Sequence, residues 1–312
     1  MADEDADEKG RERLVDWLRR ERDAHVSGGL YQVTQIRFAF NSNHMEGSTL
    51  TPEQTAQLYN TGTLLAEAGE PVRADDVVEA VNHFRAFDWM LDHVDDAVDG
   101  HLVCTLHAML KRGTRQENDP RYHVGAYKTL PNVIGAGLSD TATVLPADVP
   151  DAMGHVFGLY AQLHDDPFDI ACAHWMFETT HPFSDGNGRV GRLVMFKELL
   201  RINAMPLIVR DEDRALYVRG LSEFSSQPGY LIDTLLYERD HYRSLVTRFT
   251  QNQVRCTYND HWSRAQVESV ASGGGITNPF VRKDHMGEHR GGERRHADAD
   301  IPSARKHRRH RL

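Results

Sequence analysis

Hydrophobic residues recur every three or four positions through most of this chain, which is the spacing of helices that bury one face. Residues 168–180 and 189–201 show the spacing most clearly. We therefore predict a mainly α-helical fold. The expected helices cover a short segment from Leu14 that ends before Ser27, residues 30–45, a short segment from Thr51, and residues 75–90, 102–110, 149–163, 168–180, 189–201, 211–222, 228–238 and 241–269.

Helix-capping residues support two of these boundaries. Gly47 follows the helix expected over residues 30–45, and glycine is the usual residue for the left-handed position that ends a helix. Thr51, Pro52 and Gln54 form a capping-box pattern with proline in the first turn, which predicts the start of the next helix.

One region departs from the helical pattern. Within residues 122–144, short β-like runs at 124–128 and 133–136 flank a turn through Pro131 and Asn132. These runs predict a small β-hairpin beside the helices.

Residues that can carry out chemistry gather in the twelve positions from His181 to Arg192, HPFSDGNGRVGR. Pro182 disfavours continuation of the preceding helix, and the two following glycines, Gly186 and Gly188, permit a tight turn before the next helix. Unpaired N–H groups at the start of a helix bind anions, phosphate in particular. The segment is therefore a candidate site for a phosphorylated ligand.

The side chains of this segment suit nucleotide chemistry. Arg189 and Arg192 lie three positions apart on the new helix, so both guanidinium groups can reach one ligand. Asp185 offers the oxygen ligand that Mg²⁺ prefers, and the amide of Asn187 can reach a phosphate oxygen. His181 can accept a proton near neutral pH.

The run HPFSDGNGRVGR resembles the signature of the Fic family, HPFx(D/E)GNGRxxR, at every specified position. The resemblance covers residues 30–240 and implies a helical bundle with a β-hairpin flap beside the active site. It implies transfer of AMP from ATP, with Mg²⁺, to a Ser, Thr or Tyr hydroxyl of a target protein. His181 would be the catalytic base and Asp185 the metal ligand. The residues implied in nucleotide binding are Gly186, Asn187, Gly188, Arg189 and Arg192.

A second run resembles the family's inhibitory pattern, (S/T)xxxE(G/N). Ser42, Glu46 and Gly47 carry it, in an inhibitory helix expected over residues 30–47, ahead of the catalytic motif as in the class with an N-terminal inhibitory helix. The resemblance implies that Glu46 pairs with Arg192 and occupies the guanidinium that would otherwise hold the γ-phosphate. Autoinhibition is therefore expected.

The predicted hairpin lies where this family has its flap. The resemblance implies that a target segment pairs with the hairpin edge through main-chain hydrogen bonds, at Val133, Ile134 and Gly135. As a plain hairpin, the same residues would need no such function.

Charge and composition limit the classes of partner and the location that we expect for this protein. The net charge of −10 is uneven, because residues 282–312 carry ten Lys and Arg against five Asp and Glu. An acidic body argues against nucleic-acid binding except through this basic tail. No apolar run is long enough to cross a membrane and the acidic start does not resemble a signal peptide, so we expect a cytoplasmic protein. Three widely spaced cysteines predict reduced thiols rather than a disulfide framework.

These observations divide the chain into four parts. We expect an acidic segment and short helix at residues 1–29, the catalytic domain at 30–240, a helical extension at 241–271 and a disordered basic tail at 272–312.

Three alternative functions remain open at this stage. The same fold could transfer a phosphoryl group, as the related Doc toxins do, although both glycines match the AMP-transferring form. Glu46 could position a water that removes AMP from a modified protein. A non-catalytic ATP sensor could bind nucleic acid through its tail, although His181 argues against it. Self-modification and assembly into a homo-oligomer are also left open.

Overall fold

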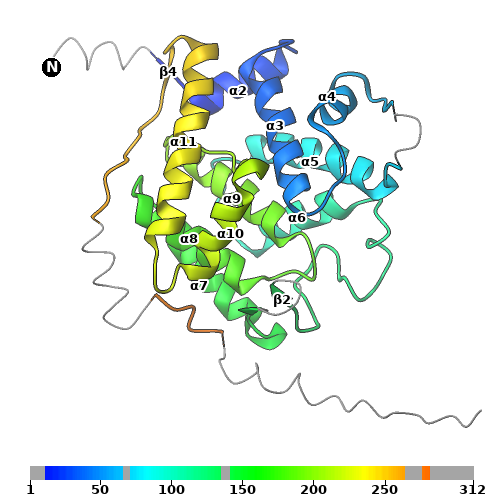
Figure 1. Cartoon of the computed structure of the whole chain (residues 1–312), viewed down its shortest axis with the longest axis vertical. Coiled ribbons are helices and arrows are strands. Elements are labelled where there is room, and N and C mark those ends of the chain that lie inside the picture. The colour runs from blue at the N-terminus through cyan, green and yellow to red at the C-terminus, as the bar shows by residue number, and fades with distance from the viewer. Residues whose placement is uncertain (1–10, 66–70, 135–140, 264–275, 282–312) are drawn as a thin grey trace, which may run out of the picture. The chain divides into compact units, whose positions relative to one another are not determined.

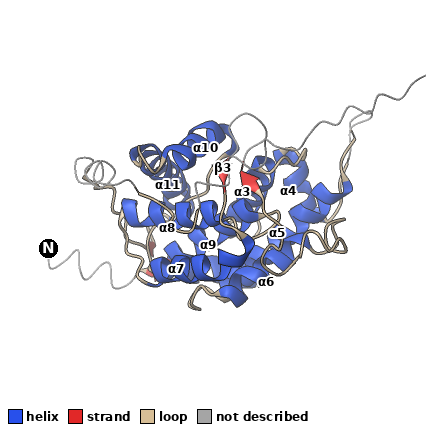
Figure 2. Cartoon of the chain, turned by 90° about the horizontal axis from the view of Figure 1, so that it is seen from below, coloured by secondary structure: helices blue, strands red, loops and turns tan. Residues whose placement is uncertain are grey.

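The computed structural model describes residues 11–65, 71–134, 141–263 and 276–281, all within one unit, Met1–Arg282. Helices make up most of this unit, as predicted (Figures 1 and 2). The helices are α2 (Leu14–Asp23), α3 (Leu30–Met45), α4 (Pro52–Thr61), α5 (Ala74–Asp92), α6 (Gly100–Lys111), α7 (Val149–Ala161), α8 (Pro167–Thr180), α9 (Asn187–Arg201), α10 (Arg214–Glu223) and α11 (Gly229–Thr250), with 3-10 turns η1 (Pro146–Asp148) and η2 (Asp211–Asp213). The strands are β1 (Glu12–Arg13), β2 (Val133–Ile134), β3 (Thr141–Ala142) and β4 (Val254–Arg255).

Helix α9 forms the centre of the core. Its residues from Asn187 to Leu200 are all buried, and it contacts α3, α5, α6 and α8, which lie around it in Figure 1. Apolar side chains and glycines on every face allow such burial. Two buried charges on α9 neutralise each other, because Lys197 donates to Glu198 at 2.7 Å. Because burial begins at Asn187, the first turn of α9 lies inside the bundle rather than on its surface.

The predicted capping residues act as expected. Gly47 takes a left-handed φ of 91° just after α3. Thr51 accepts a hydrogen bond from the Gln54 N–H at 3.1 Å, and the Gln54 side chain accepts one from the Thr51 N–H at 3.0 Å. This reciprocal pair is a complete capping box and fixes the start of α4.

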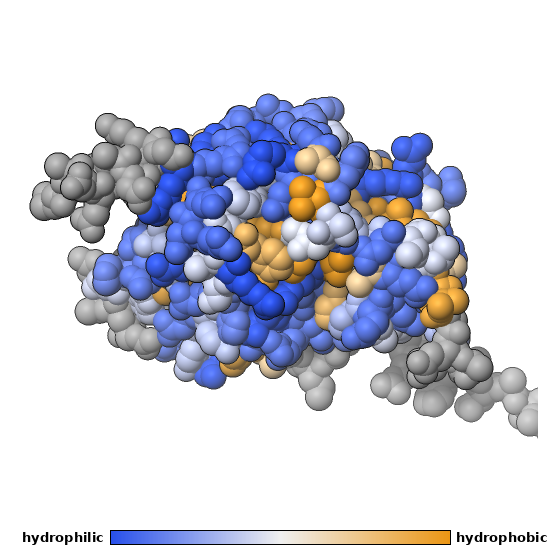
Figure 3. Space-filling model, turned by 90° about the horizontal axis from the view of Figure 1, so that it is seen from above, coloured by the Kyte–Doolittle hydropathy of each residue, from blue (hydrophilic) through white to orange (hydrophobic). Residues whose placement is uncertain are grey.

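The face in Figure 3 is mostly hydrophilic, with apolar side chains showing in a few patches. Within the described residues, no helix combines the length and the apolar character needed to cross a bilayer. Cys104, Cys172 and Cys256 are free thiols that are partly buried.

The hairpin differs in position from the prediction. Val133 and Ile134 of β2 pair antiparallel with Ala142 and Thr141 of β3. Residues 124–128, predicted as the first strand, form turns instead. Left-handed backbone at His123 and Gly125, with φ of 49° and 82°, prevents an extended strand there.

The predicted C-terminal helices are also wrong in detail. One continuous helix, α11, replaces the helices expected over 228–238 and 241–269, and it ends at Thr250. Gln251 and Asn252 both take left-handed conformations, which stops the helix. Val254 then pairs in parallel with Glu12 of β1. The helical extension of 241–271 therefore holds only up to Thr250, and residues 264–271 lie outside the described part.

The predicted disordered tail contains an ordered segment. Residues 276–281 pack on the body, with Asn278 only 7% exposed and hydrogen-bonded to the hydroxyls of Thr179 and Thr180. Ile276 and Phe280 supply the apolar contacts that a solvated tail lacks. Residues 1–10, 272–275 and 282–312 lie outside the described residues.

Candidate active site

One buried side chain shapes the turn between α8 and α9. The Asn187 carbonyl oxygen accepts from the Phe183 N–H at 2.7 Å, and its amide nitrogen donates to the Phe183 carbonyl at 2.8 Å. Gly186 takes a left-handed φ of 80° immediately before the helix. The Asn187 amide is thus engaged within the turn, so we assign it to loop shape rather than to a phosphate contact. Its backbone N–H, in the first turn of α9, still has no partner within the helix.

His181 is positioned as a neutral base. It ends α8 in a left-handed conformation with φ of 50°, and its Nδ1 lies 3.2 Å from the Glu178 carbonyl oxygen. Because a carbonyl oxygen only accepts, Nδ1 carries the proton in this contact and Nε2 keeps its lone pair. Burial and the nearby Lys128 ammonium lower the pKa of His181 to about 4. The side chain is therefore neutral at pH 7 and can take up a proton at Nε2.

Lys128 connects the hairpin to the end of α8. Its buried ammonium donates to Asn132 at 2.6 Å and to the Thr143 hydroxyl at 2.8 Å. Its backbone N–H bonds to the Pro182 carbonyl at 2.8 Å. Burial lowers the pKa of Lys128 to about 7. These contacts fix the base of the hairpin beside the turn that follows His181.

A buried network of charges surrounds the carboxylate of Asp185. Lys111, on α6, donates to Asp185 and also to Glu79 on α5, at 2.7 Å for Glu79. Arg189 pairs with Glu79 at 2.6 Å and lies 3.8 Å from Asp185. Burial opposes ionisation of Asp185, but the two cations hold its pKa below the ordinary value. Asp185 is therefore a carboxylate at neutral pH, on a loop that three helices support.

Arg192 is held by Ser42 of α3 and by Glu46, the residue that follows α3. Its Nε donates to the Ser42 hydroxyl at 3.1 Å, and its NH2 group donates to the Ser42 carbonyl at 2.9 Å and to Glu46 at 2.8 Å. The Arg192 side chain is 4% exposed, against 28% for Glu46. Burial opposes ionisation of Glu46, but Arg192 and Arg189 lower its pKa, so it binds as a carboxylate. The structure thus brings together the three residues that the two sequence motifs singled out.

Gly188 gives Glu46 access to Arg192. A Cβ atom at this position would lie 2.3 Å from the Glu46 carboxylate and 2.7 Å from the Arg192 guanidinium. The Glu46 carboxylate therefore lies directly over the first turn of α9, where the helix N–H groups and Arg192 form an anion site.

The flap residues are only partly described. Val133 and Ile134 lie in β2, and Gly135 is outside the described residues. The strand follows directly on Asn132, whose amide donates to the Phe183 carbonyl at 2.9 Å. The hairpin is therefore attached to the loop that carries Asp185.

Sequence reasoning missed Glu79, Lys111 and Lys128. All three lie outside the two motifs, and Glu79 and Lys111 are charged residues within otherwise ordinary helices. Lys111 is 1% exposed, yet no local pattern distinguishes a buried lysine from a solvated one. Their partners come from distant parts of the chain, so the tertiary structure was needed to find them.

Residues 97–199, which include the His181–Arg192 turn, match the model of the Fic/DOC family. The chain carries a Fic/DOC domain. The match begins after α3, so the contact between Glu46 and Arg192 joins the Fic/DOC domain to the helices that precede it.

Comparison with individual proteins agrees with this domain. "Protein adenylyltransferase Fic" of Nematostella vectensis is 26% identical over 194 residues, which are 59% of this chain and 42% of that protein. "Protein adenylyltransferase fic-1" of Caenorhabditis elegans is 24% identical over 191 residues, 60% of this chain and 36% of the relative. This chain therefore spans less than half the length of these curated relatives.

Similarity in three dimensions covers more of the chain. A crystal structure of a Fic domain-containing signaling protein from Bacteroides thetaiotaomicron superposes with a TM-score of 0.59 at 20% identity, covering 80% of this chain and 99% of that one. The Fic helical fold therefore includes helices outside residues 97–199.

Proposed function

We propose that this chain is a protein adenylyltransferase, which transfers AMP from ATP to a Ser, Thr or Tyr hydroxyl of a protein. The observation that carries the proposal is the neutral His181, with Nε2 free to accept a proton, next to the anion site at the start of α9. Relatives named as protein adenylyltransferases support the same assignment.

The proposed reaction uses few groups. His181 Nε2 takes the proton of the target hydroxyl, whose oxygen attacks the α-phosphorus of ATP. The bond from the α-phosphorus to the bridging oxygen breaks, and pyrophosphate leaves. The N–H groups in the first turn of α9 stabilise the charge that develops on the phosphate, and Arg192 neutralises the terminal phosphates.

Asp185 is suited to hold Mg²⁺ in this reaction. Its lowered pKa keeps it ionised, and its side chain is 35% exposed, so the carboxylate can be reached. Among the described residues no group of three or more His, Cys, Asp and Glu side chains could hold a metal. The ion would then bind to Asp185 and to phosphate oxygens of ATP, a common mode for Mg²⁺. Bound there, it would neutralise charge on the departing pyrophosphate.

Glu46 acts as an inhibitor in this proposal. It occupies the Arg192 guanidinium that the γ-phosphate requires, and it crowds Gly188, where the phosphates would approach α9. ATP must therefore displace Glu46, or α3 must move, before a productive complex forms. Removing the Glu46 carboxylate should raise activity.

The target segment is proposed to dock at β2, through main-chain pairing along Val133, Ile134 and the adjoining Gly135. Attachment of the hairpin to the loop of Asp185 supports this placement, since a docked segment would lie beside His181. Self-modification and a cytoplasmic location remain proposals. The basic tail lies outside the described residues, so nucleic-acid binding through it stays a prediction.

Intact-mass measurement tests the function. Glu46→Gly protein and Glu46→Gly/His181→Ala protein are incubated with Mg-ATP, with wild type alongside. We expect a gain of one AMP mass in Glu46→Gly, a slower gain in wild type and none without His181. Equal gain with and without His181 would disprove its role as the base. ATP binding without any added mass, on the protein itself or on supplied lysate proteins, would disprove transferase activity.

A further inference from the structure

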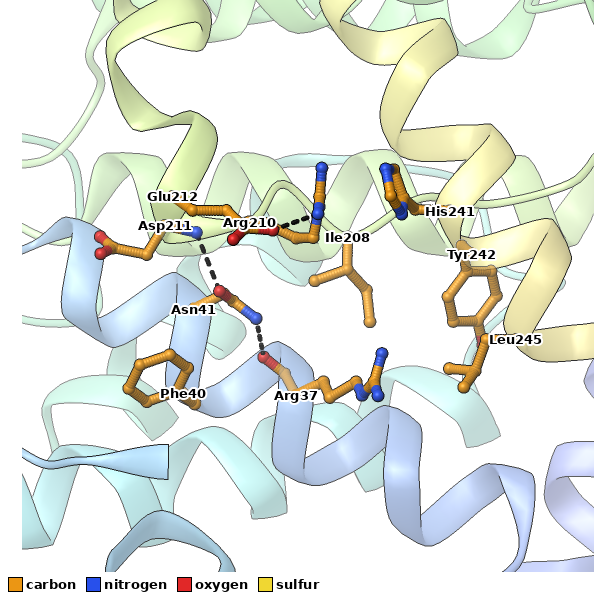
Figure 4. A pocket seen from close by; sticks show the side chains of 10 residues that line it. All are labelled: Arg37, Phe40, Asn41, Ile208, Arg210, Asp211, Glu212, His241, Tyr242 and Leu245. Carbon is orange, nitrogen blue, oxygen red and sulfur yellow. Dashed lines mark hydrogen bonds and ion pairs between the residues drawn. The ribbon is translucent and has the colours of Figure 1, made fainter. Parts of the chain in front are cut away.

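A cavity lies on the side of α3 that faces away from the proposed active site. It is bounded by α3, the segment from Ile208 to Glu212, and α11, and its volume is about 460 Å³ (Figure 4). Cavities of this size hold small molecules. The lining residues are Arg37, Phe40, Asn41, Ile208, Arg210, Asp211, Glu212, His241, Tyr242 and Leu245.

Helix α3 separates the two sites. Arg37, Phe40 and Asn41 follow the three- and four-residue spacing of one helix face and line the cavity. Ser42 and Glu46, four positions apart, use another face to hold Arg192. One helix therefore forms a wall of the cavity and also carries the proposed inhibitor.

The walls of the cavity favour an apolar ligand body. Ile208, Tyr242 and Leu245 are 6%, 3% and 7% exposed and present aliphatic and aromatic surface. In Figure 4, Tyr242 and Leu245 lie on α11 below His241, and Ile208 lies to their left, above the Arg37 guanidinium. A ring or short aliphatic group placed there would be removed from water, which is favourable.

Two side chains at the cavity are free to bind an anion. Arg210 is neutralised by Glu238 at 2.8 Å and also by Glu212 and Asp213, and Asp211 lies 2.8 Å from the His44 imidazole. Within the described part of the chain, by contrast, the Arg37 guanidinium and the His241 imidazole make no hydrogen bond or ion pair. Both are exposed. An anionic group between them would gain charge-assisted hydrogen bonds without breaking existing ones.

We propose that this cavity binds a small molecule with an anionic group on an apolar body, and that the bound molecule strengthens inhibition by Glu46. The regulatory half rests on the proposed function. A ligand that touches Arg37 on α3 and His241 on α11 connects the two helices in the arrangement in which Glu46 holds Arg192. A ligand shifts an equilibrium toward the state that it binds better, here the state with Glu46 at Arg192.

Two contacts already hold the cavity-facing side of α3 to Asp211. The Asp211 N–H donates to the Asn41 side chain at 2.8 Å, one turn before His44, which contacts the Asp211 carboxylate. These contacts lie within two turns of Glu46. A ligand that reinforces them therefore opposes the movement of α3 that ATP requires.

The binding half is tested with 8-anilinonaphthalene-1-sulfonate, an aromatic anion whose fluorescence rises in apolar sites, on the full chain. We expect Arg37→Glu to weaken its binding at least tenfold and His241→Ala at least threefold. Arg248→Glu, which reverses an exposed charge on α11 outside the cavity, is the matched control and should bind the dye like wild type. Dye binding that is absent in wild type, or equally tight in Arg37→Glu, overturns the site.

The regulatory half is tested by ATP affinity. Saturating dye should weaken ATP binding at least threefold in wild type, and by less than 1.5-fold in both Arg37→Glu and Glu46→Gly. Unchanged ATP affinity in wild type overturns the coupling. Loss of affinity to the same extent in all three proteins also overturns it, because the dye then competes at the ATP site. The dye measurements need no transferase activity, so failure of the proposed function is distinguishable from failure of this site.

Discussion

Glu178 is a buried carboxyl group that the proposed reaction does not use. It is 7% exposed, and its Oε1 has no hydrogen-bond partner among the described residues. His174 Nε2 lies 3.8 Å from this oxygen, and a Cβ on Gly191 would lie 2.4 Å from it. Burial raises the pKa of Glu178 to about 7, although Arg192 lowers it in part and Glu46 raises it further. The group is therefore largely protonated below neutral pH.

This shift predicts a pH-dependent stability difference for Glu178→Gln. The folded pKa lies above the unfolded value of 4.5, so folding is favoured most below pH 4.5 and loses stability as pH rises toward 7. Glutamine cannot ionise. Above pH 7 we expect the variant to be more stable than wild type by on the order of 3 kcal/mol, with the difference vanishing near pH 4.5.

Urea unfolding at pH 5 and pH 8 checks this prediction. A Glu223→Gln variant, which changes a carboxylate on the exposed side of α10, is the control and should show a much smaller pH-dependent difference. The same difference between Glu178→Gln and wild type at both pH values would contradict the shift.

Gly188 lies where both the Glu46 carboxylate and the phosphates of ATP are proposed to approach α9. A substitution there tests which of the two needs the glycine. A Cβ here would collide with both Glu46 and Arg192. Because the phosphates are proposed to approach the same turn, Gly188→Ala should weaken ATP binding at least tenfold, and adding Glu46→Gly should not restore it. Calorimetric titration measures both affinities. Tighter ATP binding in Gly188→Ala than in wild type would show that this glycine serves Glu46 alone.

The motif residues, from His181 to Arg192, were predictable because their chemistry is local in the sequence. Their neighbours were not. Glu79 lies more than one hundred positions from Arg189, and nothing in its own helix distinguishes it from a solvated glutamate. The free base at His181 Nε2 depends on the local backbone, because the Glu178 carbonyl, three positions earlier, and the left-handed conformation of His181 set the tautomer.

At the level of elements, Lys111 links α5 and α6 to the loop before α9. Removing a buried charge while leaving its partners destabilises a protein by roughly 3–5 kcal/mol. Because Glu79 and Asp185 keep some exposure, we expect Lys111→Met to lower the free energy of unfolding by about 2–3 kcal/mol. Chemical denaturation measures this value.

A double variant shows whether the charge network is the cause. Lys111→Met/Glu79→Gln removes one of the carboxylates left without a partner, so part of the lost stability should return. Additive losses in the two single variants would contradict the network, because independent sites add.

The presence of most helices was predicted correctly, whereas the residues at which some of them end were not. Spacing of apolar residues identified α5, α8 and α9 within one or two residues, since packing faces repeat along each helix. The end of α11 could not be predicted, because it depends on left-handed backbone at Gln251 and on pairing of β4 with a strand at the other end of the sequence. The turns at 124–128 depend in the same way on contacts with the loop after His181.

At the scale of the whole unit, a segment late in the sequence, residues 276–281, contacts the end of α8 next to the proposed active site. Asn278 donates to the hydroxyls of Thr179 and Thr180 at 3.1 and 3.2 Å, directly before His181, and Ile276 bonds through its N–H to Ser225 at 3.2 Å. The segment 276–281 thus supports the end of α8 from outside the Fic/DOC match. Nothing in the composition of a short, glycine-flanked stretch predicts this role.

Shortening the chain tests this support. A chain ending at Arg282 is the reference, and a chain ending at Ser263 lacks the segment. We expect the shorter chain to lose about 2–4 kcal/mol of unfolding free energy, because buried hydrogen bonds and the Ile276 and Phe280 contacts disappear. Asn278→Ala in the reference chain should lose about 1–2 kcal/mol, the share of the hydrogen bonds alone. Since the Thr180 carbonyl also accepts from Lys128, loosening α8 here should disturb His181 and slow self-labelling of Glu46→Gly protein. Equal denaturation midpoints for the two chain lengths would mean that the segment rests on the surface without stabilising the site.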